Sequence, residues 1–137
     1  MFIEGNQLRQ RWPVLEPNEQ FVIAEIGLGT ALNACLTIAT WLEHRPPGSR
    51  LHYIGLERAP LRPNDMQRAL HQWPQLRSVL TSLIARWPDP LAGCHRRYFD
   101  DWDVTLDLWW GDAGQILSDL ASHASPWVDA WYLDGFA

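Results

Sequence analysis

The stretch FVIAEIGLGTALN, from Phe21 to Asn33, combines a short apolar run, a glycine turn and the start of a helical pattern. The apolar run from Phe21 to Ala24 ends at Glu25 and is followed by Gly27 and Gly29, as is typical of a buried parallel strand before a tight loop. From residue 30, apolar side chains recur near helical spacing until the prolines at 46 and 47 end the pattern. The stretch therefore predicts a strand, a glycine loop and a helix in that order.

The same alternation continues along the rest of the chain. Apolar runs predict strands at 51–56 and 128–133, and helical spacing predicts helices after Pro63, after Pro74 and at 113–121. Two further runs, 95–99 and 104–110, flank the acidic segment 100–103 and predict a β-hairpin. Because strands and helices alternate, we expect an α/β fold with a mostly parallel sheet and right-handed crossovers.

The length of the chain limits its domain organisation. Its 137 residues are enough for one domain and too few for two. Residues 1–20 carry two prolines and no sustained periodicity, so we expect an N-terminal arm with at most a short strand before a domain at 21–137. The chain stops directly after an apolar strand, so we expect a partial domain whose sheet is truncated after the fourth strand.

Composition argues against several classes of function. Eleven arginines and no lysine stand against sixteen acids, and the net charge of −5 is not that of an autonomous nucleic-acid clamp. An RNA partner would need a local arginine patch or basic surface outside this chain. The sequence shows no membrane-spanning stretch and no signal-peptide pattern, so we predict a cytoplasmic protein without a membrane partner. The cysteines and histidines lack metal-ligand spacing, so we predict no metal site.

Four acids lie at or just past the carboxyl ends of predicted strands: Glu25, Glu57, Asp112 and Asp134. Ligands of open α/β sheets bind outside these strand ends, so the acids would line one crevice. An acidic crevice repels phosphate and favours a ligand with hydroxyls, an amino group and a cationic centre, and S-adenosylmethionine has all three. The structural alternative for any one acid is a helix N-cap or a solvated loop carboxylate. Asp112 would cap the helix that follows it, and Glu57 would pair with Arg58.

The glycine loop differs from the dinucleotide fingerprint GxGxxG. Gly27 and Gly29 fit its first two positions, but the third falls on Leu32. An acid two residues ahead of Gly27 instead favours an adenosyl or amino-acid ligand. We expect Glu57 to accept hydrogen bonds from both ribose hydroxyls, the role of an acid at the end of the second strand in nucleoside-binding folds.

Five segments together resemble the methyltransferase domain of the MnmC family. They are FIEGNQL (2–8) with Arg11-Trp12, FVIAEIGLGTALN (21–33), LERAPL (56–61), VTLDLWWGDA (104–113) and VDAWYLDGFA (128–137). The resemblance implies a Rossmann-like fold and an S-adenosylmethionine-dependent tRNA methyltransferase. It implies N-methylation of the aminomethyl group of 5-aminomethyl-2-thiouridine at the tRNA wobble position. A fused C-terminal FAD-dependent oxidase domain, which produces that amine, is expected in a full-length parent of this bifunctional enzyme.

The resemblance also assigns the residues that bind the cofactor. These are Glu25, Gly27, Gly29 and Asn33 in the loop region, Glu57 as the ribose ligand and Asp112 as the adenine-side contact. The family loop usually reads ETGFGTGLN, and Ile26, Leu28 and Ala31 replace its Thr, Phe and third Gly. We expect Ala31 to cost a methyl group of clearance and Leu28 to remove an aromatic face.

Three residues are candidates for the substrate side of the site. Asp134 is placed by the resemblance where the methyl donor meets the amine, and we expect it to accept a hydrogen bond from the neutral amine and receive its proton. Phe136 is a candidate for stacking on the base, and Arg58 is a candidate phosphate contact.

Other functions are compatible with the same sequence features. One is a small-molecule methyltransferase on a related sheet. A nicotinamide-dependent oxidoreductase is disfavoured by the missing third glycine and by the acidic crevice. A third alternative is a non-catalytic remnant that binds RNA or a partner.

Overall fold

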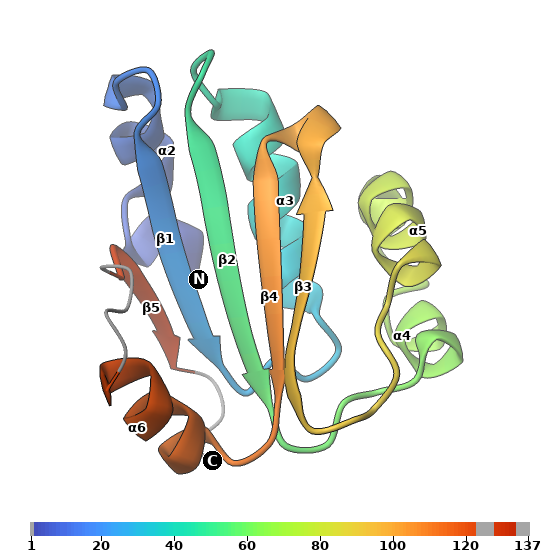
Figure 1. Cartoon of the computed structure of the whole chain (residues 1–137). Helices are drawn as coiled ribbons and strands as arrows, with labels where there is room; N and C mark the ends of the chain where they lie inside the picture. Colours follow the sequence, from blue (N-terminus) through green and yellow to red (C-terminus); the bar gives the residue numbers. More distant parts are fainter. Residues whose placement is uncertain (1, 123–127, 134–137) are drawn as a thin grey trace.

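A five-stranded sheet forms the centre of the computed structural model, which describes residues 2–122 and 128–133 (Figure 1). The strands are β1 (Gln20–Ile26), β2 (Arg50–Glu57), β3 (Gly93–Phe99), β4 (Val104–Trp110) and β5 (Ala130–Leu133), in the order β3-β4-β2-β1-β5. Among these described strands β3 alone is antiparallel to its neighbour. The predicted α/β fold with a mostly parallel, Rossmann-like sheet is therefore confirmed, but the expected count of four strands is wrong, because the antiparallel β3 adds a fifth to the four parallel strands.

Helices cover both faces of the sheet. The structure describes α1 (Phe2–Gly5), α2 (Leu8–Arg11), α3 (Leu32–His44), α4 (Pro63–Ala69), α5 (Arg77–Ala85) and α6 (Ala113–Ser122), with 3₁₀ turns η1 (Trp12–Val14), η2 (Pro74–Leu76) and η3 (Asp100–Trp102). The larger hydrophobic cluster joins one face of the sheet to α1 through α5, whereas α6 packs on the smaller cluster of the other face. In Figure 1, α3 accordingly lies behind the sheet.

Strand β1 contributes to both hydrophobic clusters. Phe21 and Ile23 point into the larger cluster, while Val22, Ala24 and Ile26 belong to the smaller one, because successive side chains of a strand alternate between its faces. A strand covered on both faces needs apolar residues at nearly every position. This is why β1 appears in the sequence as a continuous apolar run.

The N-terminal segment differs from its prediction. We expected at most a short strand, but residues 2–14 form α1, α2 and η1. Helices of four residues are unstable alone, so these depend on tertiary packing. Ile3, Leu8 and Trp12 are buried, and the Trp12 ring packs edge-on against Phe21 and Trp41, with centroids 6.1 and 5.3 Å away. The boundary at residue 20 stays a prediction.

The hairpin predicted around the acidic segment is confirmed. β3 and β4 pair from Gly93 with Trp110 to Phe99 with Val104, and η3 connects them. Asp103 closes the connection in the left-handed region, at φ 55°. The hairpin adds β3 to one side of the parallel sheet.

The four parallel strands end at one edge of the sheet, the lower edge in Figure 1. The chain builds outward from β1 through β2 to β4 and then places β5 on the other side of β1. Such a reversal of strand order is where open α/β sheets bind their ligands. The glycine loop, Glu57 and Asp112 all lie at this edge.

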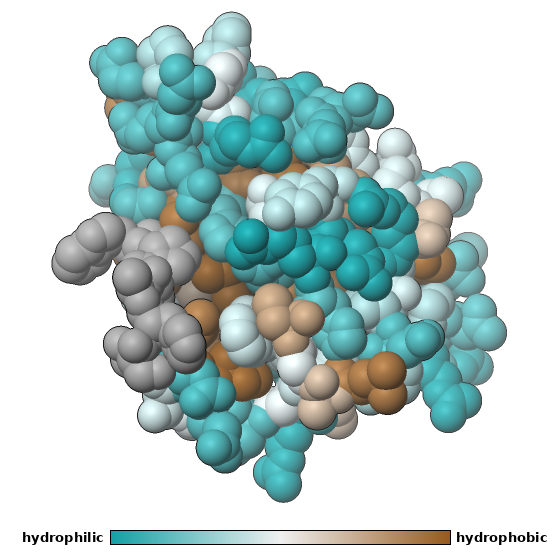
Figure 2. Space-filling model, viewed as in Figure 1, coloured by the Kyte–Doolittle hydropathy of each residue, from teal (hydrophilic) through white to brown (hydrophobic). Residues whose placement is uncertain are grey.

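The surface carries both hydrophilic and hydrophobic areas. Figure 2 shows mainly hydrophilic side chains, with hydrophobic ones gathered beside the residues drawn in grey. Trp131 and Leu133 of β5 contribute exposed apolar surface, at 43% and 56% exposure. Among the described residues, no helix has the length and apolar character needed to cross a membrane.

Candidate cofactor-binding site

The loop after β1 is anchored to the end of β2 by backbone hydrogen bonds. The N–H groups of Gly27 and Leu28 both donate to the Leu56 carbonyl, at 2.9 and 3.1 Å. Gly27 and Gly29 adopt φ angles of 85° and 57°, in the left-handed region that glycine enters without steric cost. The two predicted loop glycines therefore shape a turn that is fixed before any ligand binds.

Leu28 packs this loop down onto the sheet. Its side chain is buried, and a Cβ added to Gly55 of β2 would lie 2.8 Å from Leu28 Cδ1. The replacement of the family's Phe by Leu28 is therefore a change in packing below the loop. The close approach also explains a glycine within a central strand, where it otherwise weakens pairing.

Replacing Gly55 with valine is expected to destabilise the protein by about 1–3 kcal/mol, because the new side chain overpacks the space that Leu28 fills. The loop would be lifted from β2, so affinity for an adenosyl ligand should fall as well. Denaturant unfolding and ligand titration measure the two effects. Gly5→Val is the matched control, since a Cβ at Gly5 meets nothing within 4 Å. Equal stability of the two variants would contradict this account.

Ala31 stands where the family has its third glycine, and its backbone is strained. Its φ is 70°, and its side chain is fully buried. A left-handed conformation costs a non-glycine residue about 1–2 kcal/mol. The structure thus adds a second physical reason for glycine at this position, the backbone angle.

Glu25 lies at the carboxyl end of β1, one residue before the last residue of the strand, in agreement with its predicted place at the strand end. Its side chain is 0% exposed. Tyr53 donates a hydrogen bond from its hydroxyl to Oε1 at 2.6 Å, and Asn33 donates from Nδ2 to Oε2 at 2.8 Å. The structure therefore brings together the two predicted residues Glu25 and Asn33, and it adds Tyr53.

Aromatic and hydroxyl groups extend this buried polar cluster toward β5. The hydroxyls of Thr37 and Tyr132 are hydrogen-bonded at 2.8 Å, and the Tyr53 and Tyr132 rings pack edge-on, 6.0 Å apart. Burial raises the pKa of Tyr53 well above its usual value, and the neighbouring Glu25 raises it further. Sequence reasoning missed Tyr53, Thr37 and Tyr132. Strand alternation could have placed Tyr53 on the same face as Gly55, but not beside Glu25.

Glu57, the last residue of β2, contacts the glycine loop directly. Its Oε1 accepts a hydrogen bond from the Gly29 N–H at 2.7 Å, and its Oε2 accepts one from the Ala59 N–H at 3.0 Å. The salt bridges found among the described residues include no Glu57–Arg58 pair, and Arg58 is exposed. The carboxylate is thus fixed at the loop, where it can accept hydrogen bonds from ligand hydroxyls.

Asp112 follows β4 and caps α6. Its Oδ2 accepts a hydrogen bond from the Gln115 N–H at 3.0 Å, and its carbonyl accepts one from the Ile116 N–H. The helix cap that the sequence offered as the alternative role of Asp112 is therefore present. This role is compatible with a contact between a ligand and the same end of β4. Asp134 and Phe136 lie outside the described residues, beyond the end of β5 at Leu133.

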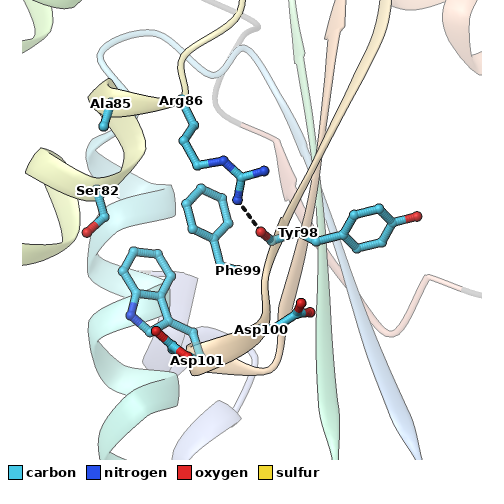
Figure 3. A pocket seen from close by; sticks show the side chains of 8 residues that line it. Ser82, Ala85, Arg86, Tyr98, Phe99, Asp100 and Asp101 are labelled. Atoms are coloured by element: carbon cyan, nitrogen blue, oxygen red, sulfur yellow. Dashed lines mark hydrogen bonds between the residues drawn. The ribbon is translucent and has the colours of Figure 1, made fainter.

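The structure contains a cavity of about 410 Å³ at the opposite edge of the sheet (Figure 3). It lies between α5 and the β3–η3 corner, and Arg86, Phe99 and Trp102 form part of its lining. The Phe99 and Trp102 rings stack at 4.8 Å, and the Arg86 guanidinium lies 5.0 Å from the Phe99 centroid. Because β4 begins at this corner, the cavity is remote from the glycine loop.

The described residues contain no group of three or more His, Cys, Asp or Glu side chains arranged to hold a metal ion. The acids at the ligand-binding edge hydrogen-bond to backbone N–H groups, to a hydroxyl and to an amide. Their arrangement suits a ligand that offers hydrogen-bond donors.

Known proteins that are similar to this chain include S-adenosylmethionine-dependent methyltransferases, in agreement with a site for an adenosyl ligand. Residues 74–137 match a family model of S-adenosyl-L-methionine-dependent methyltransferases. The chain is 43% identical over 140 residues to the tRNA 5-methylaminomethyl-2-thiouridine biosynthesis bifunctional protein MnmC of Aeromonas hydrophila, covering 100% of this chain and 21% of that protein. The MnmC proteins of Acinetobacter baylyi and Aeromonas salmonicida are 43% and 41% identical, again over 100% of this chain and 22% and 21% of their own lengths.

The chain thus spans about a fifth of the length of the curated relatives it matches. The resemblance to the MnmC family predicted from the sequence is confirmed, as is the S-adenosylmethionine-dependent methyltransferase class.

Proposed function

We propose, from the resemblance of this chain to the bifunctional MnmC proteins along its whole length, that it is the N-methylating part of a tRNA-modifying enzyme. Its substrate would be the aminomethyl group of 5-aminomethyl-2-thiouridine at the tRNA wobble position. The observation that carries the proposal is the Glu57 carboxylate held against a preformed glycine loop at the reversal of strand order. That is the arrangement expected for an adenosyl ligand.

The residues at this edge fit S-adenosylmethionine. Glu57 would accept hydrogen bonds from the ribose hydroxyls, and the backbone between Gly27 and Gly29 would allow close approach of the ligand. An acidic edge also suits a ligand that carries a sulfonium and an ammonium group and no phosphate. When bound, this ligand supplies a methyl group attached to a positively charged sulfur.

On the substrate side, Asp134 would orient the amine. A new N–C bond forms as the S–C bond breaks, so the attacking amine must be neutral and aligned with the methyl carbon. Asp134 would accept a hydrogen bond from the amine and receive the proton that the product ammonium releases. Phe136 would stack on the modified base, and Arg58, which is exposed beside Glu57, would contact a tRNA phosphate.

The remaining features concern the longer protein. We propose that it carries a fused FAD-dependent oxidase domain, in line with the word bifunctional in the names of the relatives. The oxidase would generate the amine that this part methylates. A cytoplasmic location would follow from tRNA as substrate.

The test is transfer of a labelled methyl group from S-adenosylmethionine to tRNA by the full-length protein. tRNA that carries 5-aminomethyl-2-thiouridine should be labelled at the wobble position, and tRNA without the aminomethyl group should not be. Labelling of a small amine in place of tRNA would favour a small-molecule methyltransferase. Ligand binding without transfer to either substrate would favour a non-catalytic remnant.

Replacing Asp134 with asparagine in the full-length protein is expected to lower the rate of methylation about 10- to 100-fold, the value of one hydrogen bond to a charged group. Single-turnover measurement of labelled tRNA gives the rate, and titration with S-adenosylmethionine serves as the control because its affinity should be preserved. A variant with normal affinity and full activity would contradict the role assigned to Asp134.

A further inference from the structure

We infer that Glu25 is a positioning residue that holds the cofactor loop through Asn33 and Tyr53, and that it does not bind the ammonium group of S-adenosylmethionine directly. The inference rests on the proposed function, since it concerns the same site. It differs from the role that sequence reasoning gave to this acid, which was a direct ligand.

The position of Glu25 argues against direct contact with a ligand. Its side chain is 0% exposed, and it lies within β1, paired in register with Gly55 on one side and Tyr132 on the other. A ligand beyond the strand ends would have to displace the packing around it. By contrast, Glu57 at the end of β2 is only partly buried.

The carboxylate of Glu25 is engaged on both oxygens. Tyr53 donates to Oε1 at 2.6 Å and Asn33 donates to Oε2 at 2.8 Å. Burial and then the charge of Glu25 raise the pKa of the adjacent Cys35 to about 12, which reflects an enclosed environment. Buried carboxylates with such hydrogen bonds hold their partners in one geometry.

The partners of Glu25 belong to the elements that frame the loop. Asn33 is the second residue of α3, two positions after Ala31 at the end of the turn. Tyr53 lies on β2, two residues before Gly55, which receives the Leu28 side chain. Glu25 therefore ties β1, β2 and the start of α3 together around Leu28 and Gly29, and loss of this tie should shift the loop as a unit.

The test compares two neutral thioethers, S-adenosylhomocysteine and methylthioadenosine. Both contain the adenosyl group, but methylthioadenosine lacks the amino-acid part and its ammonium. In Glu25→Gln, one of the two acceptor oxygens becomes an NH₂ donor and the negative charge is lost, so Tyr53 and Asn33 no longer each donate to a carboxylate oxygen. A positioning role predicts that the affinities for both ligands fall by the same factor, about tenfold or more.

Loss of affinity for S-adenosylhomocysteine alone would overturn the inference, because it would show direct contact with the amino-acid part. Unchanged affinity for both ligands would overturn it too. Glu43→Gln is the matched control, since Glu43 is exposed on α3. If the unmodified protein bound neither ligand, the proposed function would fail, and the inference with it. If the unmodified protein bound both ligands and Glu25→Gln lost affinity for them by different factors, the inference would fail but the proposed function would stand.

A double variant distinguishes loss of the hydrogen bond between Glu25 and Asn33 from general misfolding of the single variant. Glu25→Gln combined with Asn33→Asp exchanges the donor and the acceptor, so the hydrogen bond between β1 and α3 can form again. The positioning role predicts that affinity for both thioethers recovers to within about threefold of the unmodified protein. Failure to recover in a double variant that unfolds cooperatively would contradict the role.

Discussion

Replacing Glu57 with alanine is expected to lower the affinity for S-adenosylmethionine by a factor of about a hundred or more. A hydrogen bond to a charged group contributes about 1.5–3 kcal/mol, and the ribose offers two hydroxyls to this carboxylate. Together they amount to about 3–6 kcal/mol, and each 1.4 kcal/mol is a factor of ten in affinity.

The alanine variant would also release the glycine loop. Glu57 holds the Gly29 N–H at 2.7 Å and the Ala59 N–H at 3.0 Å, so both segments lose an anchor with the carboxylate. A looser loop must be ordered when the ligand binds, and this ordering reduces affinity further. Glu57→Gln keeps the size of the side chain and one acceptor, so its affinity should lie between those of the alanine variant and the unmodified protein.

Calorimetric titration of the full-length protein with S-adenosylmethionine, and separately with NAD(H), measures this effect. Glu43→Ala removes an exposed carboxylate from α3 and should leave the affinity unchanged. An alanine variant of Glu57 that bound S-adenosylmethionine within threefold of the unmodified protein would contradict the ribose role. Tighter binding of NAD(H) would contradict the choice of ligand.

The sequence predicted the order of strands and helices because each has a distinct pattern. Continuous apolar runs mark strands buried on both faces, and the glycine loop marks the turn from β1 into α3. The exact end of β1 is less clear from the pattern. The charge of Glu25 predicts that the apolar run ends there, whereas the strand continues by one residue to Ile26.

Of the partners of Glu25, Tyr53 could not be predicted, because the contact depends on register between strands 28 positions apart. The bond between Thr37 of α3 and Tyr132 spans 95 positions and likewise requires the folded sheet with α3 packed on it. The N-terminal helices were missed for a different reason. Four residues are too few to show a helical period, and their stability comes from Ile3, Leu8 and Trp12 in the core.

A second large effect is expected at a charged network on the sheet face that α6 partly covers. Asp107 of β4 is 4% exposed and accepts two hydrogen bonds from Arg96 of β3, both at 2.7 Å. His52 of β2 lies 2.7 Å from the second oxygen of Asp107, and Gln20 lies 3.4 Å from the other ring nitrogen of His52. The network therefore crosses four neighbouring strands.

Asp107 makes this network sensitive to acid. Burial alone would raise the pKa of the carboxyl, but the hydrogen bonds from Arg96 and His52 outweigh it and lower the pKa from 3.8 to about 2. Because the pKa is lower in the folded state, the network stabilises the fold fully above pH 4. We expect about 2 kcal/mol of this stability to be lost as the pH falls from 4 to 2.

Replacing Arg96 with methionine is expected to cost about 3 kcal/mol of stability, because it leaves the buried Asp107 carboxylate with His52 alone. Losing one partner of a buried pair typically costs about 3–5 kcal/mol, and the 49% exposure of the Arg96 side chain places this case at the lower end. The loss of stability between pH 4 and 2 should shrink as well, since the pKa of Asp107 then moves back toward its ordinary value.

Urea unfolding at several pH values measures both consequences of the Arg96 variant. Arg97→Met is the matched control, because the neighbouring guanidinium donates to the backbone carbonyls of Arg86 and Arg96 and contacts no carboxylate within the described residues. It should cost no more than about 1 kcal/mol and retain the acid sensitivity. Equal losses for the two arginines, or an acid response that Arg96→Met leaves unchanged, would show that the ion pair does not stabilise this side of the sheet.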